Sequence, residues 1–361
     1  MPPYKQSNRS WMAKFRYKTW NGETRWVTKR GFPTRREAVQ WEEDYKLKMS
    51  GSINMLLRDF VQVYREDKTP RLKESTLVTK ENIIDTKLLP YLGEMRLCDI
   101  TSADILQWQN EIMRQINPQT KKPFSRSYLK TIHNQLSAIL NHAVRFYGLP
   151  ANPARSVGNM GSEKGIEMKF WTNEEYQKFV EGIMDEPMAY YCFEVLYWSG
   201  IREGELLALT PADIDLKKKT ISVTKTFQHI NGKDLVTDPK TSKSRRMVKI
   251  PDFLCEELRD YMRMQYELRP EDRLFPVTKN YLHRKMALGC QRQGMKKIRI
   301  HDLRHSHVSL LISQGYSAVA IADRMGHESI DITYRYAHLF PSAQEQMADT
   351  LDQLRKEPGD V

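Results

Sequence analysis

The chain has 361 residues, 40% of them hydrophobic, so it is long enough to bury the cores of two or three domains. Lys and Arg outnumber Asp and Glu by 57 to 45, and the formal net charge of +12 favours a polyanionic partner, nucleic acid before a membrane surface. The N-terminus lacks an apolar signal core, no run approaches the roughly 18 apolar residues of a membrane span, and the four cysteines form no Cys-x-x-Cys pair. We therefore expect a reduced, cytoplasmic protein with no membrane partner, no disulfide framework and no cysteine-ligated zinc.

The first 50 residues predict a small basic β-sheet closed by one helix. In "WMAKFRY", residues 11–17, apolar side chains alternate with Lys14 and Arg16, which lie on the opposite face of a strand. Asn21-Gly22 has the composition of a hairpin turn, and a helical pattern follows the second strand. Lys14 and Arg16 are candidate DNA contacts of such a sheet. A packing appendage without a DNA role is the alternative.

Residues 54–155 predict a compact helical domain. Within them, apolar side chains recur at helical spacing from Leu129 to Ala143, and Gly148 with the following proline ends that helix. The polar segment "NPQTKKPFS" lies between two predicted helices and is rich in turn-forming residues. Its Lys121 and Lys122 are candidate DNA contacts, and an ordinary solvated loop is the alternative.

Residues 167–361 predict a larger domain that mixes helices with short strands. Thr172 and Glu175 have the spacing of a capping box and mark the start of a helix. Further along, "TISVTKTF" and "RRMVKIP" read as strands on either side of residues 231–244, a segment rich in turn formers and basic side chains. The pattern indicates a mixed α/β domain.

Three polar clusters in this domain combine positive charge with helix or turn positions. In "SGIREGEL" an apolar helix stops at a glycine, and Arg202 and Glu205 then lie three apart on one helical face. The basic turn "DPKTSKSRR" contains Lys240, and "HDLRHSH" places His301 and Arg304 three apart. Each cluster alone has an ordinary explanation, such as a local ion pair or a solvated loop lysine.

The histidines and tyrosines leave further alternatives open. His301 and His305 are four apart on a predicted helix, which suggests a metal site, but no cysteine or glutamate accompanies them as a convincing third ligand. The stretch "MGHESIDITYRYAHLF" brings Tyr334 and Tyr336 close to His327. Tyrosines at a helix end are commonly core aromatics, so neither needs to be reactive.

The clusters share one chemical theme. Arginines, a lysine and histidines are the donors that hold a phosphate whose negative charge grows in a pentacoordinate transition state. Tyrosine is then the candidate nucleophile. A phenol with a pKa near 10 is a poor nucleophile, but a DNA hydroxyl can later displace it from phosphorus. This combination favours reversible strand transfer over hydrolysis.

In this order, "SGIREGEL", "DPKTSKSRR", "HDLRHSH", "MGHES" and "YRYAHL" closely resemble the tyrosine recombinase (phage integrase) family, in particular integrases of phages and conjugative transposons. The resemblance spans essentially the whole chain. It implies a multidomain, mainly α protein with small β-sheets, in three parts: an arm-type DNA-binding module (1–50), a helical core-binding domain (54–155) and a mixed α/β catalytic domain with a C-terminal tail helix (167–361).

The resemblance also implies a role for each matching residue. Arg202 and Arg304 would clamp the phosphate, supported by Glu205, and His327 would add a further donor. Lys240 would protonate the leaving oxygen, and His301 would assist proton transfer from the phenol. The family's tyrosine lies nine positions beyond the last histidine, which selects Tyr336. Two residues apart on a helix differ by roughly 200° around the axis, so Tyr334 would face elsewhere.

Two positions depart from the family's pattern. Ser199 stands where a threonine is expected and Met325 where a leucine is expected, and we expect both changes to affect packing alone. The tail segment "PSAQEQMADTLDQLRKE" carries Met347, Leu351 and Leu354 as a narrow apolar stripe. The resemblance implies that this tail docks on a neighbouring subunit. Folding back on its own domain is the alternative.

The function implied is that of a site-specific DNA recombinase, an integrase that forms a 3′-phosphotyrosine and passes through a four-way junction. It would act on double-stranded DNA, at core and arm attachment sites, as a homotetramer, with neither metal nor cofactor. An accessory DNA-bending or excision factor is a further partner in this scheme. Two alternatives are a type IB topoisomerase-like enzyme that only relaxes DNA and a non-catalytic DNA-binding regulator of the same fold.

Overall fold

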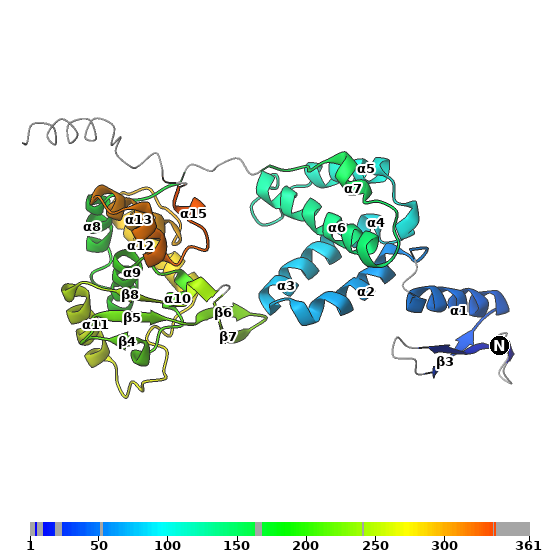
Figure 1. Cartoon of the computed structure of the whole chain (residues 1–361), viewed down its shortest axis with the longest axis horizontal. Helices are drawn as coiled ribbons and strands as arrows, with labels where there is room; N and C mark the ends of the chain where they lie inside the picture. Colours follow the sequence, from blue (N-terminus) through cyan, green and yellow to red (C-terminus); the bar gives the residue numbers. More distant parts are fainter. Residues whose placement is uncertain are drawn as a thin grey trace, which may run out of the picture. The chain divides into compact units, whose positions relative to one another are not determined.

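The computed structural model of the protein divides into two compact units, residues 1–166 and 167–361, each with its own hydrophobic core (Figure 1). The structure describes residues 4–5, 10–18, 24–50, 53–162, 168–239, 242–334 and 336. Within those ranges, no helix has both the length and the apolar character needed to cross a membrane. The predicted tail helix and its apolar stripe lie outside the described residues.

The first unit begins with the predicted sheet. Its three antiparallel strands lie in the order β1-β2-β3, and a helix follows them; their bounds are β1 Tyr4–Lys5, β2 Trp11–Lys18, β3 Thr24–Phe32 and α1 Arg35–Ser50. Lys18 pairs with Thr24 at the end of the β2-β3 ladder. The Asn21-Gly22 turn predicted between these strands lies outside the described residues.

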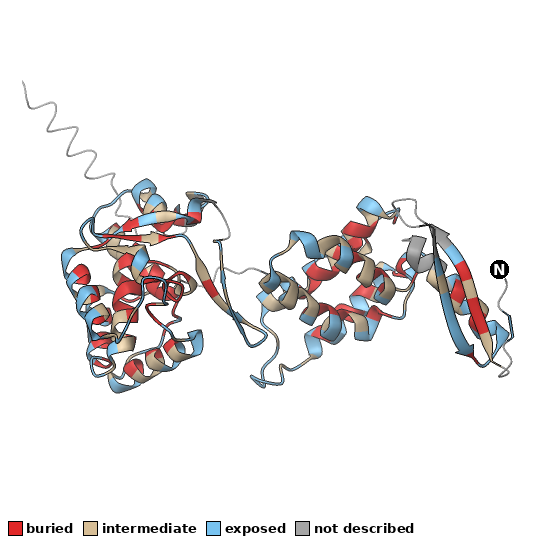
Figure 2. Cartoon of the chain, turned by 90° about the horizontal axis from the view of Figure 1, so that it is seen from below, coloured by how far each residue is buried: buried red, intermediate tan, exposed pale blue. Residues whose placement is uncertain are grey.

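The alternation predicted for β2 is confirmed from Ala13 to Arg16, whereas Met12, beside a register irregularity, is also buried. Ala13 and Phe15 are buried, and the Phe15 ring lies 6.1 Å from that of Trp41 on α1. Figure 2 marks both buried and exposed residues along the strands of this sheet. Lys14 and Arg16, from the other face of β2, lie over the Trp26 ring of β3.

The middle of the chain forms the predicted helical domain. Its helices are α2 Leu57–Lys68, α3 Glu74–Ile83, α4 Leu89–Leu92, α5 Ser102–Arg114, α6 Arg126–Phe146 and α7 Pro153–Val157. A π-helical turn, Ile84–Leu88, joins α3 to α4 directly before Pro90. Because proline lacks an N–H and its ring crowds the preceding turn, a widened turn at this place has an evident cause. Short 3-10 helices cover Thr69–Arg71 and Leu97–Asp99.

Helix α6 carries the apolar stripe that the sequence predicts. Every member of the stripe, from Leu129 to Ala143, is buried, and the helix begins where the Ser125 hydroxyl accepts a hydrogen bond from the Tyr128 amide. In Figure 2 the buried faces of these helices point towards one another. The stripe therefore forms the spine of the domain core.

The second unit is built around one helix, α9, most of whose residues are buried. Its helices are α8 Asn173–Glu181, α9 Pro187–Ser199, α10 Glu203–Leu206, α11 Asp252–Met264, α12 Lys279–Arg292, α13 Asp302–Ser313, α14 Ala318–Met325 and α15 Asp331–Tyr334. Helix α9 packs against α11, α12 and α13 (Figure 1). The capping box predicted for Thr172 and Glu175 is present at the start of α8.

The strands of this unit form two separate sheets. One has the order β4-β5-β8 and the other is the β6-β7 pair; their bounds are β4 Ile214–Asp215, β5 Thr220–Val223, β6 Thr226–Ile230, β7 Lys233–Thr237 and β8 Arg246–Lys249. Short 3-10 helices cover Pro211–Asp213 and Ser242–Ser244.

Residues 231–244, which the sequence places between two predicted strands, contain a further strand, β7, that was not predicted. Asn231 and Gly232 both adopt positive φ angles, 51° and 76°, and close a hairpin between β6 and β7. Consecutive residues with positive φ are the signature of the tight hairpin turn that an Asn-Gly pair favours. The basic segment that follows therefore joins two different sheets.

Candidate active site

One side of the site is formed at the C-terminal end of α9. Gly200 ends the helix with a left-handed φ of 67°, and a Cβ atom there would lie 2.5 Å from the His307 ring. The Ser199 hydroxyl donates to the Val195 carbonyl, and Met325 is fully buried. Ser199 and Met325 are therefore packing residues, as expected, and the chain leaves α9 towards Arg202.

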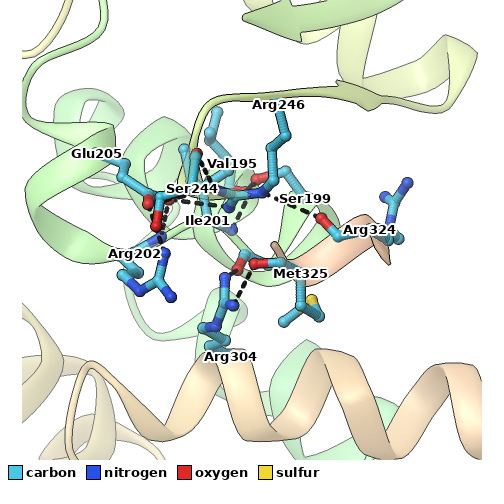
Figure 3. A network of polar contacts seen from close by, with 11 residues as sticks. Val195, Ser199, Ile201, Arg202, Glu205, Ser244, Arg246, Arg304, Arg324 and Met325 are labelled. Atoms are coloured by element: carbon cyan, nitrogen blue, oxygen red, sulfur yellow. Dashed lines mark hydrogen bonds and ion pairs between the residues drawn. The ribbon is translucent and has the colours of Figure 1, made fainter. Parts of the chain in front are cut away.

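Glu205 holds two arginines from different elements (Figure 3). Its Oε1 accepts a hydrogen bond from Arg202 Nη1 at 2.8 Å, and Arg246 donates to both carboxylate oxygens, at 3.2 and 2.9 Å. Burial opposes ionisation of this carboxyl, but the hydrogen bonds and charge of Arg246 and Arg202 outweigh it and lower its pKa. Glu205 is thus a buried anion that fixes the directions of two cations.

Arg304 lies beneath this pair, on α13. It is 4% exposed, and its guanidinium donates to the Gly200 carbonyl at 2.7 Å and to the Met325 carbonyl. Burial, followed by repulsion from Arg202 and Arg246, lowers its pKa to about 9. Arg304 therefore connects the end of α9 with the end of α14.

The last predicted histidine follows the end of α14. Gly326 terminates the helix with a φ of 62°, and a Cβ atom there would lie 2.8 Å from both the Arg246 side chain and the Lys243 carbonyl. His327 is 8% exposed, and its Nδ1 is 2.8 Å from the Thr333 hydroxyl. Thr333 itself is fully buried, so the hydrogen bond at Nδ1 fixes the imidazole on its buried side.

The two tyrosines have opposite environments. Tyr334 ends α15 and is 54% exposed, whereas Tyr336 is 3% exposed and packs beside α13, where its hydroxyl forms a hydrogen bond with His305 Nδ1. The separation arises from a turn after α15, in which the Tyr336 amide donates to the Thr333 carbonyl, rather than from a continuous helix. Tyr336 is thus the tyrosine that points into the histidine and arginine cluster.

Positive charge exceeds negative charge at this site. The guanidinium groups of Arg202, Arg246 and Arg304 lie around the carboxylate of Glu205, while a second buried carboxylate nearby, that of Asp302, pairs with Arg299. Burial and nearby positive charge lower the pKa values of three histidines: that of His301, and those of His305 and His327, each to about 4. Each of these histidine pKa values is lowered, as expected in a buried, positively charged site that binds an anion.

A pocket of about 380 Å³ opens beside this cluster, lined by Arg246, Gly326 and His327 among others. Lys243, also on its wall, donates to the Glu328 carbonyl at 3.1 Å. Lys240, the lysine predicted to act at this place, lies outside the described residues.

Three parts of the chain match models of known families: residues 169–343 match the phage integrase family, residues 56–113 the SAM-like N-terminal domain of phage integrases, and residues 3–49 an arm DNA-binding domain. The ICEBs1 integrase of Bacillus subtilis (strain 168) is 30% identical over 343 residues, which are 89% of this chain and 90% of that protein. The chain belongs to the phage integrase family. It is an integrase, a tyrosine-type site-specific recombinase, as the sequence predicts.

Other members of the family agree with this assignment. The integrase of Mycobacterium phage L5 is 25% identical over 75% of this chain and 72% of its own. Among solved structures, the Tn1549 transposon integrase bound to a circular intermediate DNA has a TM-score of 0.68 at 16% identity, covering 83% of this chain and 99% of that chain. A lambda integrase tetramer bound to a Holliday junction has a TM-score of 0.59 at 16% identity, covering 95% of each. The structural likeness concerns the fold, and it agrees with the predicted fold class.

The candidate DNA contacts of this integrase lie on exposed parts of the first unit. Lys14 Nζ and Arg16 Cζ lie 4.9 and 5.3 Å from the centre of the Trp26 ring, which is 53% exposed. Lys121 and Lys122 are exposed in the loop between α5 and α6, where Lys121 has a positive φ of 55°. Their contact with DNA stays a prediction.

Sequence reasoning did not assign three residues that shape the site. Arg246 was one basic residue among several in its segment, and its pairing with Glu205 spans 41 positions. His305 was considered only as half of a metal site, yet its ring contacts Tyr336. Arg324 donates to His307 Nε2 at 3.0 Å and to the Trp198 carbonyl at 3.2 Å, and so braces α14 against α9. The one available signal was the density of Arg and His in these segments.

Proposed function

We propose that this integrase cleaves and rejoins double-stranded DNA through a covalent 3′-phosphotyrosine formed at Tyr336. The observation that carries the proposal is the surplus of buried positive charge around Glu205, beside the turn that bears Tyr336. A scissile phosphate supplies the missing anion. Stabilising its transition-state charge with fixed donors is the largest rate effect available to such a site.

Each cation has a distinct part in this reaction. Arg202 and Arg304 donate charge-assisted hydrogen bonds to the non-bridging oxygens of the phosphate. The lowered pKa of His327 keeps its ring neutral at physiological pH. We propose that the Thr333 hydroxyl, 2.8 Å from Nδ1, donates to that nitrogen, so that the ring proton lies on Nε2 as a further donor to the same phosphate.

Lys240 is the general acid of the cleavage step. It protonates the 5′-oxygen as the bond from phosphorus to that oxygen breaks, which frees a 5′-hydroxyl. The 5′-hydroxyl of a second duplex then attacks the phosphotyrosine and releases Tyr336. Two such rounds exchange strands through a four-way junction. His301 assists proton movement at the other side of the phosphate.

We propose that three modules engage the DNA: residues 1–50 at arm sites through Lys14 and Arg16, residues 54–155 at the core site, and residues 167–361 at the scissile phosphate. The Lys121 and Lys122 loop contacts the backbone of the core site. Four subunits act together on the junction, and the predicted tail helix links neighbours. Support comes from the arm-binding family match and from the lambda integrase tetramer bound to a Holliday junction.

The relatives point to a mobile element as the natural substrate. The B. subtilis relative is named for the element ICEBs1, and the Tn1549 integrase was solved with a circular intermediate DNA. We infer that the present enzyme integrates or excises an element of comparable kind. Its recombination sites are then the junctions that flank its own gene.

Incubation of the protein with nicked and supercoiled DNA that carries those junctions tests the proposal. After denaturation, we expect protein covalently attached to DNA and recombinant strands that depend on paired sites. Relaxation of any supercoiled plasmid without recombinants would identify a topoisomerase-like enzyme. Site binding without a covalent adduct would identify a non-catalytic regulator.

A further inference from the structure

His305 makes direct contact with the side chain that the proposed function treats as the nucleophile. It lies on α13, directly after Arg304, and its Nδ1 forms a hydrogen bond with the Tyr336 hydroxyl. The two ring centres are 5.6 Å apart with their planes inclined at 53°. Tyr336 is 3% exposed, so this contact is sheltered from solvent.

The surroundings of His305 keep its ring neutral. Burial and neighbouring positive charge lower its pKa to about 4. Its Nε2 lies 3.9 Å from Asp302 Oδ1. Its ring is nearly perpendicular to that of His301, with the ring centres 5.1 Å apart. The charged and titratable groups that face it, from α13 and from the segments before and after it, are Arg299, His301, Asp302, Arg304, His327 and Tyr336.

We propose that His305 is a catalytic base of the cleavage step, whose Nδ1 orients the Tyr336 hydroxyl and accepts its proton. The inference rests on the proposed function, in which Tyr336 attacks phosphorus. As the phenolic O–H bond breaks, the tyrosine oxygen bonds to phosphorus, the bond to the 5′-oxygen breaks, and Lys240 supplies the proton that this oxygen needs. In the rejoining step His305 returns its proton to the departing phenol.

The proposal gives His305 and His301 different roles. The ring that bonds to the tyrosine hydroxyl is that of His305, whereas His301 meets His305 edge to face. Asp302, close to Nε2, favours the protonated ring that forms when Tyr336 loses its proton. His301 then stabilises this arrangement rather than receiving the proton first.

The test is single-turnover cleavage of a nicked core-site duplex over pH 6 to 9 by wild type, His305→Ala and His305→Gln, each with its core-site affinity measured. At pH 7 we expect His305→Ala to cleave at least about 100-fold more slowly. The deficit should narrow by up to about tenfold per pH unit, because hydroxide ionises more of the phenol as pH rises. The exposed His283→Ala on α12 is the matched control and should cleave at the wild-type rate.

His305→Gln separates orientation from proton transfer. Glutamine can accept a hydrogen bond but not a proton, so we expect it to show the same pH-dependent deficit as alanine. A glutamine variant that cleaves at the wild-type rate, or a deficit that is the same at every pH, would overturn the role as a base. If the alanine variant does not fold, the glutamine variant decides.

A substrate with a 5′-bridging phosphorothiolate distinguishes proton transfer to the leaving group from proton transfer out of the attacking tyrosine. Its sulfur leaves without a proton, so this substrate should rescue Lys240→Ala but not His305→Ala. Rescue of His305→Ala would place the histidine on the leaving-group side and overturn the proposal. Tyr336→Phe on the same substrate separates the proposed function from the role of His305. If this variant still forms the adduct, Tyr336 is not the nucleophile and the proposed function is wrong. If it forms no adduct, a negative result with the His305 variants argues only against His305 as the base.

Discussion

Arg246 connects Glu205 with the end of α14. Its terminal nitrogens bond to both carboxylate oxygens of Glu205, while its Nε donates to the Arg324 carbonyl at the end of α14. The side chain is 7% exposed, so the ion pair is buried. A buried pair of this kind does not by itself guarantee stability, but breaking it leaves an unpaired charge. Arg246 therefore fixes Glu205, and through it Arg202.

We expect Arg246→Ala to lower the free energy of unfolding by about 3–5 kcal/mol, because the buried Glu205 would lose its buried partner and keep only Arg202, whose side chain is 37% exposed. Arg246→Lys should recover part of this loss, since an ammonium keeps the charge but cannot make the paired hydrogen bonds. Urea unfolding measures both variants. The neighbouring Arg245→Ala is the control, because its pair with Asp238 is exposed and should contribute under about 1 kcal/mol. Equal losses for the two alanine variants would contradict this account.

At the residue scale, sequence reasoning works where a residue's role is fixed by its motif. Arg202, Arg304 and His327 follow from the match to the family's motifs, and the three side chains lie close together in the structure. Tyr336 is selected by its nine-residue spacing from His327. The supporting argument, that Tyr334 and Tyr336 lie on opposite faces of one helix, is wrong because α15 ends at Tyr334. The pairing of Arg246 could not be predicted, since nothing local marks a contact with a carboxylate 41 positions away.

At the scale of elements, α9 carries a buried acid that bears on stability. Glu194 accepts hydrogen bonds from the Tyr176 hydroxyl at 2.8 Å and from Trp198 Nε1 at 2.9 Å. Burial, reinforced by the charge of Glu257, raises its pKa from 4.5 to about 7. The folded state therefore holds a proton that the unfolded chain releases above pH 4.5. Its stabilising effect is complete below that pH and is lost as pH rises to 7.

We expect Glu194→Gln to flatten the pH dependence of stability, because glutamine imitates the protonated acid at both hydrogen bonds. Between pH 5 and 7.5 the wild type should lose about 2–3 kcal/mol more of its free energy of unfolding than the variant. Chemical unfolding at several pH values measures the difference. Glu256→Gln, on the exposed side of α11, should leave the wild-type slope unchanged. A variant with the wild-type slope at Glu194 would show that this acid titrates normally.

Elements with local signals were predicted well, and the others were not. The capping box of α8 and the apolar stripe of α6 depend on neighbouring residues, and both were correct. The β6-β7 hairpin was missed although Asn231-Gly232 marks it, because the basic residues beyond it dominated the interpretation. Which strands share a sheet depends on tertiary contacts that no local pattern shows. Here β5 pairs with β8, and the β6-β7 hairpin lies between them in the sequence.

At the scale of the whole molecule, the family matches divide the chain into an arm-binding, a core-binding and a catalytic part, in agreement with the predicted fold class. This organisation could be predicted because each part has its own periodicity and composition. The docking of the tail could not be tested, since residues beyond 336 lie outside the described part of the chain. Assembly on the junction stays a proposal.

Deletion of residues 1–50 should spare cleavage at a core site but weaken binding to DNA that carries flanking arm sequences. The salt dependence of binding to the long DNA should also become shallower, because phosphate contacts from this module are lost. Titrations at several salt concentrations measure both effects. Lys14→Ala with Arg16→Ala is the matched variant, and it should reproduce part of the loss while leaving the sheet intact. An unchanged affinity for long DNA would make the module a packing element.

The central claim is that Tyr336, and not Tyr334, becomes joined to DNA. The most direct measurement traps the protein on a nicked core-site duplex, digests the adduct and identifies the modified peptide by mass spectrometry. We predict that wild type and Tyr334→Phe carry the nucleotide on Tyr336, while Tyr336→Phe binds the site with nearly unchanged affinity and forms no adduct. A nucleotide found on Tyr334, or an adduct formed by Tyr336→Phe, would contradict the account.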